Sequence, residues 1–396
     1  MRNRKRLGLA LAGWLILVSG LILAACGSPP TPASEPVATL RPTFTPVTPE
    51  QPTAENTPTA YSTATAVPDS DTPTPGSGTE TAATPEPSAL PAATKATGPM
   101  PKLSGTLFYP VFDTADQTYH IYRMDLSSGK TEKFVEQASQ PAVTSDGARI
   151  AWRSWDPKQR GLLSRPMDGT DTWRMIDFAE AARPDWAADN QQFVFPSRQE
   201  PDRQSRLYLF TGTGEEPFIE LRTHGSPIIG RTPAFLPDGQ IVYQGCAESL
   251  CGLYLIDGDG ANPRQLTMFK DDTTPAVSPD GEQIAYMSMI SGYWQINVVN
   301  TDGSGQRSLT DDWYWNGLPV WSPDGEHIIF VSTRDENWPN NFQLSKNVDF
   351  RLWIMDADGG NQRPLDETTF RLDGVPAGVP QDQAWGWIEE RLFWLP

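Results

Sequence analysis

Beyond residue 102, apolar and polar residues alternate in short runs that are bounded by turn-forming residues. Ile150-Ala-Trp152 follows Asp146-Gly147, and Ile328-Ile-Phe330 follows Asp324-Gly325 in the same way. Alternation with a period of two predicts β-strands, and an Asp-Gly pair between two such runs is typical of a tight hairpin. No stretch of this region shows convincing helical periodicity. We therefore predict an all-β domain over residues 103–396.

The same pattern recurs along this domain. Each copy begins with a Pro, continues to an Asp-Gly or similar turn, and then enters an apolar run. Copies begin at Pro141, Pro184, Pro233, Pro275 and Pro319, and a sixth, without the Pro and the Asp-Gly, begins at Gln383. A second turn follows in most copies, for example at Asp259-Gly260. Four strands in about 42–49 residues is the size of a propeller blade.

The repeat count predicts a six-bladed β-propeller of four-stranded antiparallel blades. Five Pro-led copies and residues 383–387 supply six first strands, whereas residues 106–135 supply only the later strands of a blade. We therefore expect the C-terminal strand to close the ring by joining residues 106–135. One strand is left over in this scheme, because Thr106–Tyr109 and Leu392–Leu395 both resemble second strands.

The quoted repeats resemble a known family. Pro319-Val-Trp-Ser-Pro-Asp-Gly and Ser278-Pro-Asp-Gly are similar to the repeats of the TolB-type six-bladed propeller, also called the WD40-like repeat. The resemblance covers residues 103–396 and implies the fold. The family includes the periplasmic Tol–Pal component, sugar- or protein-binding modules, and the propeller beside the hydrolase domain of prolyl oligopeptidases. This chain departs from the Tol protein, because a Pro/Thr-rich segment replaces the small α/β domain, and from the peptidases, because it has no Gly-x-Ser-x-Gly.

Residues 1–26 are predicted to be a lipoprotein signal peptide. Four cationic residues among the first six precede an apolar run that ends in Leu23-Ala24-Ala25-Cys26. A charged start, an apolar stretch and small residues before the cleavage point are typical of a secretory signal. The final Cys26 resembles the lipidated cysteine of bacterial lipoproteins, which implies a protein held on a bacterial membrane, at the cell surface or in the periplasm. The alternative is a plain transmembrane anchor with an incidental Cys26.

Residues 27–102 are predicted to be a disordered tether. This segment holds 17 Pro and 17 Thr and only a few large apolar residues. It cannot bury enough apolar surface to offset its backbone entropy. A chain with this much polyproline character could reach about 200 Å, at ~3.1 Å per residue. We interpret it as a spacer that holds the propeller away from the membrane; the alternative is a linker with no length requirement.

Charge and composition exclude several functions. The chain has 49 acidic and 31 basic residues, a net charge of −18, and only three His and three Cys. Such an acidic protein repels phosphate backbones, so we expect no nucleic-acid partner. The scarcity of His and Cys argues against a zinc site and a Ser-His-Asp site. We therefore predict a non-enzymatic protein without metal or cofactor.

Cys246 and Cys251 flank a four-residue hairpin between two predicted strands. In an exported protein, two such cysteines are expected to form a disulfide, because facing positions of neighbouring strands lie at about the separation that the bond requires. The alternative is two free buried thiols.

The predicted binding face is the face that carries the blade-to-blade loops and the loops between second and third strands. Aromatic and acidic residues gather in these loops, whereas the other face has only short turns. The candidate residues are Trp155, Trp313, Tyr314, Trp315, Trp338, Asp311, Asp312 and Asp335. Exposed aromatics among polar groups on a rigid scaffold are typical of a binding surface. The alternative is that these aromatics pack over the blade edges.

The sequence thus favours a monomeric, membrane-anchored scaffold of the cell envelope that binds another protein. A glycan or cell-wall polysaccharide is the alternative ligand, with Trp313, Trp315 or Trp338 stacking on sugar rings. A carbohydrate-active enzyme with paired carboxylates is a third hypothesis, for which Asp311 and Asp312 are the candidates.

Overall fold

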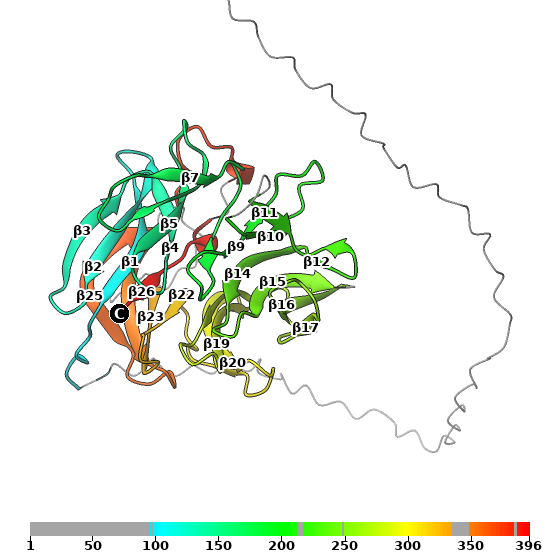
Figure 1. The fold of residues 1–396 in the computed structure, drawn as a ribbon. Coiled ribbons are helices and arrows are strands. Elements are labelled where there is room, and N and C mark those ends of the chain that lie inside the picture. Colours follow the sequence, from blue (N-terminus) through cyan, green and yellow to red (C-terminus); the bar gives the residue numbers. More distant parts are fainter. Residues whose placement is uncertain (1–95, 97, 213–216, 248, 335–347, 384–385) are drawn as a thin grey trace, which may run out of the picture. The chain divides into compact units, whose positions relative to one another are not determined.

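The computed structural model describes residues 96, 98–212, 217–247, 249–334, 348–383 and 386–396, which all belong to the unit Ala83–Pro396 (Figure 1). Several predicted features lie outside the described residues: the signal peptide, the tether up to residue 95, Asp335, Trp338 and residues 384–385 of the sixth predicted first strand. Within the described part, no helix is long and apolar enough to cross a membrane.

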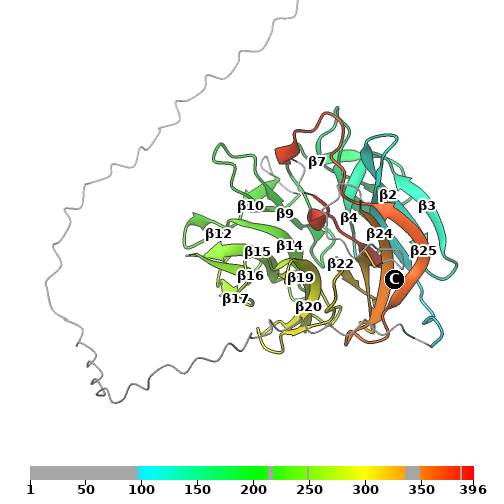
Figure 2. The ribbon, with the colours of Figure 1, turned by 180° about the vertical axis from the view of Figure 1, so that it is seen from behind.

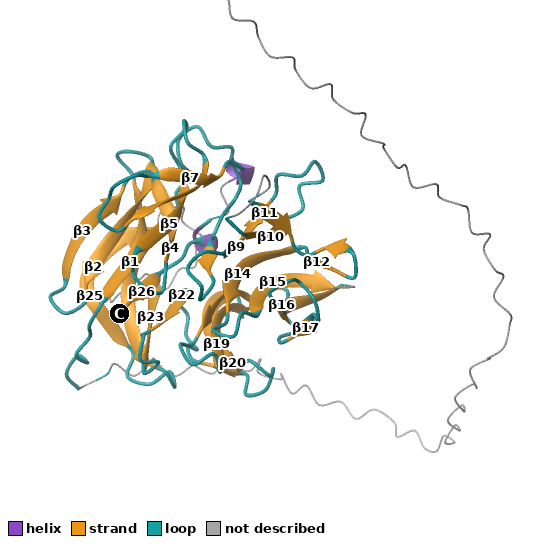
Figure 3. Cartoon of the chain, viewed as in Figure 1, coloured by secondary structure: helices purple, strands orange, loops and turns teal. Residues whose placement is uncertain are grey.

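The described residues form six four-stranded antiparallel sheets, arranged as the blades of a ring (Figure 1, Figure 3). Blade 1 contains β26 (Phe393–Leu395), β1 (Thr106–Asp113), β2 (Thr118–Asp125) and β3 (Lys130–Val135). Blade 2 contains β4 (Ala138–Val143), β5 (Arg149–Ser154), β6 (Gly161–Pro166) and β7 (Trp173–Ile176). Blade 3 contains β8 (Asp185–Trp186), β9 (Phe193–Ser197), β10 (Arg206–Phe210) and β11 (Phe218–Glu220).

Blade 4 contains β14 (Gly230–Phe235), β15 (Ile241–Ala247), β16 (Leu250–Ile256) and β17 (Arg264–Gln265). Blade 5 contains β18 (Thr273–Val277), β19 (Gln283–Ile290), β20 (Tyr293–Asn300) and β21 (Arg307–Ser308). Blade 6 contains β22 (Asn316–Trp321), β23 (His327–Ser332), β24 (Asp349–Asp356) and β25 (Arg363–Arg371). A small ribbon of β12 (Arg222–Thr223) and β13 (Ser226–Pro227) lies between blades 3 and 4 in the sequence. The prediction of a six-bladed, all-β propeller is confirmed.

The Asp-Gly turns of the repeat are built by local hydrogen bonds. In blade 2, Asp146 Oδ1 accepts from the Thr144 hydroxyl at 2.6 Å and from the Ala148 N–H at 2.9 Å. Gly147 adopts a φ of 68°, which favours glycine. Asp280 and Asp324 form the same pair of bonds in blades 5 and 6. A few neighbouring residues therefore fix each hairpin.

The first strands of the blades surround a central channel, and neighbouring blades pack through buried apolar side chains. At the junction of blades 5 and 6, for example, Ile296 and Val298 cluster with Phe330 and Trp353. Similar clusters occur at the other junctions, so the core is a ring of blade-to-blade contacts.

The C-terminal strand closes the ring by joining residues 106–135, as predicted, but residues 393–395 supply that strand and not residues 383–387. β26 pairs with β1, with Leu107 opposite Trp394, and forms the innermost strand of blade 1. The described ends of the expected first strand are not in a strand: Gln383 ends a short 3-10 helix, η1 (Gln381–Gln383), and Trp387 begins another, η2 (Trp387–Glu389). The segment has lost the Pro and the Asp-Gly turn that build a first strand in the other copies. No strand is therefore left over among the described residues.

Candidate functional site

The two faces of the ring differ, as expected from the strand order. The blade-to-blade loops and the loops between second and third strands lie on one face, here called the loop face. The turns between first and second and between third and fourth strands lie on the other, here called the turn face. The structure places two features on the loop face: an apolar patch over blades 4 and 5, and a charged closing segment at the channel entrance.

The apolar patch consists of six large side chains, three at the ends of β16 and β19 and three in the loops that lead from blade 4 to blade 5 and from blade 5 to blade 6. Its members are Leu250, Met268, Phe269, Met289, Ile290 and Trp313. Met268 is 81% exposed, Phe269 64% and Leu250 60%. Adjacent apolar pairs at 268–269 and 289–290 break the alternation of the strands. That break is the sequence pattern that would have predicted the patch.

Hydrogen bonds hold the loop that presents Met268 and Phe269. Gln244 on β15 donates from Nε2 to the Lys270 carbonyl oxygen at 3.1 Å, which ties blade 4 to its outgoing loop. Asp272, in the same loop, is fully buried and accepts from the Phe269 N–H at 3.3 Å. Burial raises the pKa of the Asp272 carboxyl. The loop that presents Met268 and Phe269 is therefore held by its own hydrogen bonds and by β15.

Cys246 and Cys251 lie opposite each other on β15 and β16, and their sulfur atoms are joined at 2.02 Å. Leu250 lies inside this closed hairpin. The disulfide therefore tethers the two strands next to one edge of the apolar patch.

The structure separates the residues predicted for the binding face. Trp313 is half exposed and meets the Tyr293 ring edge-to-face at 5.4 Å, and Asp311 is exposed. Trp315 is half buried and stacks on Trp387 at 6.1 Å, and Tyr314 is also half buried. Trp313 and Asp311 are thus the exposed members among those that the structure describes.

Two further predicted residues are buried. Asp312 is paired with Arg334 at 2.5 Å and accepts from Asn316 Nδ2 at 2.9 Å, so it holds its loop in place. Trp155 is 4% exposed; its Nε1 donates to Ser139 Oγ at 2.9 Å, and Arg153 lies over its ring at 4.2 Å. Neither side chain is on the surface, because each has buried polar partners that sequence reasoning did not locate.

The closing segment, residues 386–391, lies across the channel between the blades, in the middle of the ring (Figure 1, Figure 2). Two side chains from the inner strands β4 and β18, and a third from the segment just before β8, bond to its backbone carbonyls. Gln140 Nε2 donates to the Glu389 oxygen at 3.1 Å, Arg183 Nη1 to Glu390 at 3.0 Å, and Thr274 Oγ1 to Ile388 at 2.9 Å.

These three side chains occupy equivalent positions in the repeat. The residue before the repeat Pro has a positive φ in every Pro-led copy, between 40° and 57°; the residues are Gln140, Arg183, Thr232, Thr274 and Leu318. In four of these blades the strand register shifts at this point, which marks a β-bulge. A bulge re-aims the side chain of its extra residue. The bulges therefore direct side chains at the closing segment.

The closing segment brings two carboxyl groups into the interior. Glu389 and Glu390 are each 3% exposed. Ser139 donates its hydroxyl to Glu390 Oε1 at 3.1 Å, and Arg231 lies 3.6 Å from Glu389 Oε1. Burial raises the pKa of Glu390 to about 7, with Arg153 opposing the rise, and burial also raises the pKa of Glu389.

The pKa values of the arginines around this segment are shifted in the opposite direction. Burial lowers the pKa of Arg153 and of Arg183 to about 10. Both therefore remain cations at neutral pH, so the entrance on the loop face is a buried cluster of mixed charges.

One group of residues has the spacing of a metal site but the hydrogen bonding of a structural histidine. His120 Nε2 lies 3.1 Å from Asp116 Oδ2 and 3.9 Å from Asp113 Oδ2. His120 Nδ1 accepts from the Gln137 N–H at 3.2 Å. A neutral imidazole that accepts at Nδ1 carries its proton on Nε2, so it has no lone pair left for a metal there.

Comparison with known proteins agrees with this geometry. Residues 222–348 match the family model of the TolB beta propeller domain. The crystal structure of TolB from Acinetobacter baumannii has a TM-score of 0.55 and 18% identity, covering 68% of this chain and 66% of that one. The domain is a TolB-type β-propeller. At this identity the structural likeness shows the fold alone.

Relatives found by sequence match this chain over limited lengths. An uncharacterized protein of Agrobacterium fabrum is 33% identical over 173 residues, which cover 43% of this chain and 55% of that protein. The Tol-Pal system protein TolB of Rhizorhabdus wittichii is 36% identical over 97 residues, which cover 24% of this chain and 18% of that protein. The chain therefore spans about half or less of the length of these relatives.

Proposed function

We propose that this protein is a lipid-anchored, extracytoplasmic scaffold whose loop face binds another protein. The observation that carries the proposal is the apolar patch. Six large side chains from neighbouring loops are exposed on a rigid ring, and contiguous exposed apolar patches are typical of interaction sites. Met and aromatic residues are enriched in the centres of protein interfaces.

The negative charge of this chain indicates which kind of partner would bind the patch. Asp271 and Asp311 each lie two positions from a patch residue in the sequence, and the chain as a whole has a net charge of −18. An acidic surface accelerates the approach of a basic partner and repels anionic polymers. The partner we propose is a protein with an apolar contact surface and a basic rim.

The N-terminal region supplies the anchor in this proposal. The cationic start, the apolar run and Cys26 support lipidation, and the Pro/Thr-rich segment supports a spacer between the membrane and the propeller. The resemblance to TolB proteins supports a role in the cell envelope. The partner's identity does not follow from this resemblance, because the alignments cover only part of each relative.

Site-specific photo-cross-linking in cells tests the proposal. A photoreactive amino acid replaces Phe269 in the full-length chain, and the matched control replaces Glu282, which is exposed on the turn face. We expect a discrete protein adduct from position 269 only. The adducted protein is then purified, and Met268→Ser with Phe269→Ser should weaken its affinity for the propeller more than tenfold while the melting temperature is unchanged.

The same experiment identifies the competing outcomes. Adducts to lipid alone, or equal adducts from both positions, would contradict a protein-binding loop face. A glycan is the second candidate, because Trp313 presents a half-exposed ring beside Tyr293. Loss of the protein adduct in the presence of cell-wall oligosaccharides, together with saturable sugar binding that Trp313→Ala removes, would favour the glycan.

A further inference from the structure

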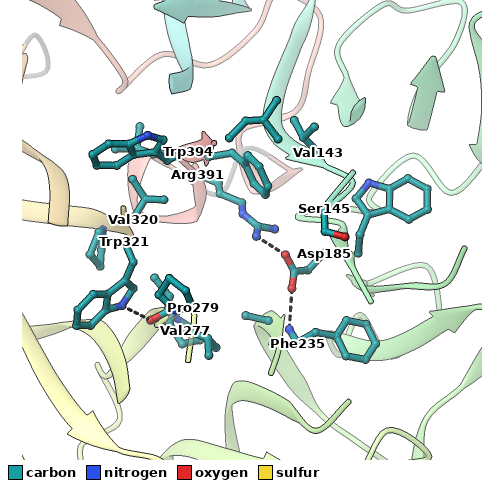
Figure 4. Close-up of a pocket in the computed structure, with 18 of the residues that line it drawn as sticks. Val143, Ser145, Asp185, Phe235, Val277, Pro279, Val320, Trp321, Arg391 and Trp394 are labelled. Carbon is teal, nitrogen blue, oxygen red and sulfur yellow. Dashed lines mark hydrogen bonds and ion pairs between the residues drawn. The ribbon is translucent and has the colours of Figure 1, made fainter. Parts of the chain in front are cut away.

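The central channel holds a cavity of about 380 Å³ that is separate from the loop face (Figure 4). Its lining comes from β4, β8, β14, β18, β22 and the C-terminal strand β26. At the turn face the lining ends in exposed Ala188, Pro279 and Pro323. At the other end, the Arg391–Asp185 pair and the closing segment block it. The cavity is therefore a blind pocket that opens at the turn face.

Most of the residues that line this pocket are apolar. Three tryptophan rings line it, and their N–H groups are already used: Trp186 donates to the Ala142 carbonyl at 3.2 Å, Trp321 to Ala276 at 3.0 Å and Trp394 to Ser104 at 3.0 Å. Val143, Val277 and Val320 complete much of the remaining wall (Figure 4). The walls thus favour an apolar ligand.

The blocked end carries charge, and one donor there is unused. Arg391 donates to the Pro184 carbonyl oxygen at 2.7 Å and pairs with Asp185, whose other oxygen accepts from the Phe235 N–H at 2.6 Å. These groups are satisfied by one another (Figure 4). Arg183 also lines the pocket and is 3% exposed, yet its Nε has no hydrogen-bond partner.

An unused buried guanidinium donor is costly, and a carboxylate is its strongest complement. Two arginines, Arg183 and Arg391, line this end together with Asp185, while the carboxyl groups of Glu389 and Glu390 act on Arg183 from the closing segment. A negatively charged head group would therefore find an open donor on the buried Arg183 guanidinium, next to a second cation, Arg391.

We propose that the channel is a binding site for a small amphiphile with an aliphatic body and a carboxylate head. The body lies against Trp186, Trp321 and Trp394, and the head accepts from Arg183 Nε. Ligand pockets of about 300–1,000 Å³ with apolar walls and a few placed polar groups are typical. An apolar cavity of about 150 Å³ already holds benzene, so this pocket has room for a chain of about eight carbons. The site is independent of the loop face and of its protein partner.

The test measures two probes that differ only in their head group. Octanoate and octanol, each fluorinated at the last carbon, are titrated by fluorine NMR into the full-length protein in lipid nanodiscs, with empty nanodiscs as the blank. We expect octanoate to bind the protein about tenfold or more tightly than octanol, because a hydrogen bond to a charged group contributes that much affinity. Equal affinities would overturn the assignment of the head group.

Two variants locate the site. Arg183→Met should lower the octanoate affinity to that of octanol and leave octanol unchanged. Val320→Phe, which fills the channel, should abolish binding of both probes, whereas Val375→Phe on an exposed loop should not.

Binding that survives Val320→Phe, or no binding to the wild type, would overturn the proposal. If Arg183→Met fails to fold, as judged by its melting curve, the comparison of Val320→Phe with Val375→Phe decides alone. Cross-linking from position 269 should be unaffected by Val320→Phe, so failure here is separable from failure of the scaffold proposal.

Discussion

The Gln140 side chain donates from Nε2 to the Glu389 carbonyl oxygen at 3.1 Å, across 249 residues of sequence. Gln140 is the bulge residue of blade 2, and Glu389 belongs to the segment that closes the ring. This bond and its equivalents from Arg183 and Thr274 tie the last residues of the propeller to three other blades. Closure of this ring is therefore more than the pairing of β26 with β1.

The buried Glu390 makes the stability of the propeller depend on pH. Its pKa is raised from 4.5 to about 7 by burial, so the folded state holds a proton that the unfolded state has released. The stability that this bound proton provides is fully present below pH 4.5 and is lost as the pH rises through about 7. We expect Glu390→Gln to flatten the fall in unfolding free energy between pH 5 and pH 8, which amounts to at most about 3 kcal/mol.

Urea unfolding at pH 5, 6, 7 and 8 measures this effect. Glu282→Gln removes an acid on the turn face with the same change of charge and should keep the wild-type slope. If the unfolding free energies of the wild type and Glu390→Gln fall in parallel with pH, the buried carboxyl of Glu390 is not the source of the pH dependence.

Trp394 should be a major contributor to ring closure. It is 6% exposed, lies in β26 opposite Leu107, and donates from Nε1 to the Ser104 carbonyl oxygen. Trp394→Ala should cost about 3–5 kcal/mol through the cavity that it leaves. Hydrogen exchange should accelerate in all six blades rather than in blade 1 alone, because opening the ring removes a constraint shared by every blade. Acceleration confined to β26 and β1 would contradict this account.

Trp313 and Trp315 should respond differently to truncation, although they are two residues apart. Trp313 is half exposed, so Trp313→Ala should change the unfolding free energy by about 0.5–1 kcal/mol. Trp315 stacks on Trp387 of the closing segment, so Trp315→Ala should cost about 2 kcal/mol or more. Thermal melting of the two single variants checks the difference. Equal costs would mean that the contact with Trp387 contributes little.

Cys26 is expected to carry the membrane anchor. Cys26→Ser removes the thiol to which the lipid would be attached, so the chain should remain unprocessed or be released from the membrane fraction. Fractionation and mass spectrometry of the N-terminus provide the measurement, with Cys246→Ser as a control that removes a different cysteine. Unchanged processing and partitioning of Cys26→Ser would contradict lipidation.

The sequence by itself determined the blade. Asp146 and Gly147 form their turn through hydrogen bonds to residues within two positions and through a backbone conformation that glycine favours. Alternation in the flanking runs then places one side of each strand in the core. Because these causes are local, they recur in the Pro-led copies, and those five copies together with residues 106–135 account for the six blades. Cys246 and Cys251 were predictable as neighbours for the same reason, since one short hairpin joins them.

Only the tertiary structure decided what happens where the repeat ends and where loops meet. Residues 383–387 kept the spacing of a first strand, yet Gln383 ends η1 and Trp387 begins η2, and the partners of Ile388 and Glu389 in and beside η2 are bulge residues of distant blades. Trp155 lay in a connection typical of a binding face, yet Ser139 and Arg153 bury it. Met268 and Phe269 became part of a patch only when the ring brought the loops of blades 4 and 5 together. Local hydrogen bonds can be read from neighbouring residues, but burial depends on contacts between residues that closure of the ring brings into proximity.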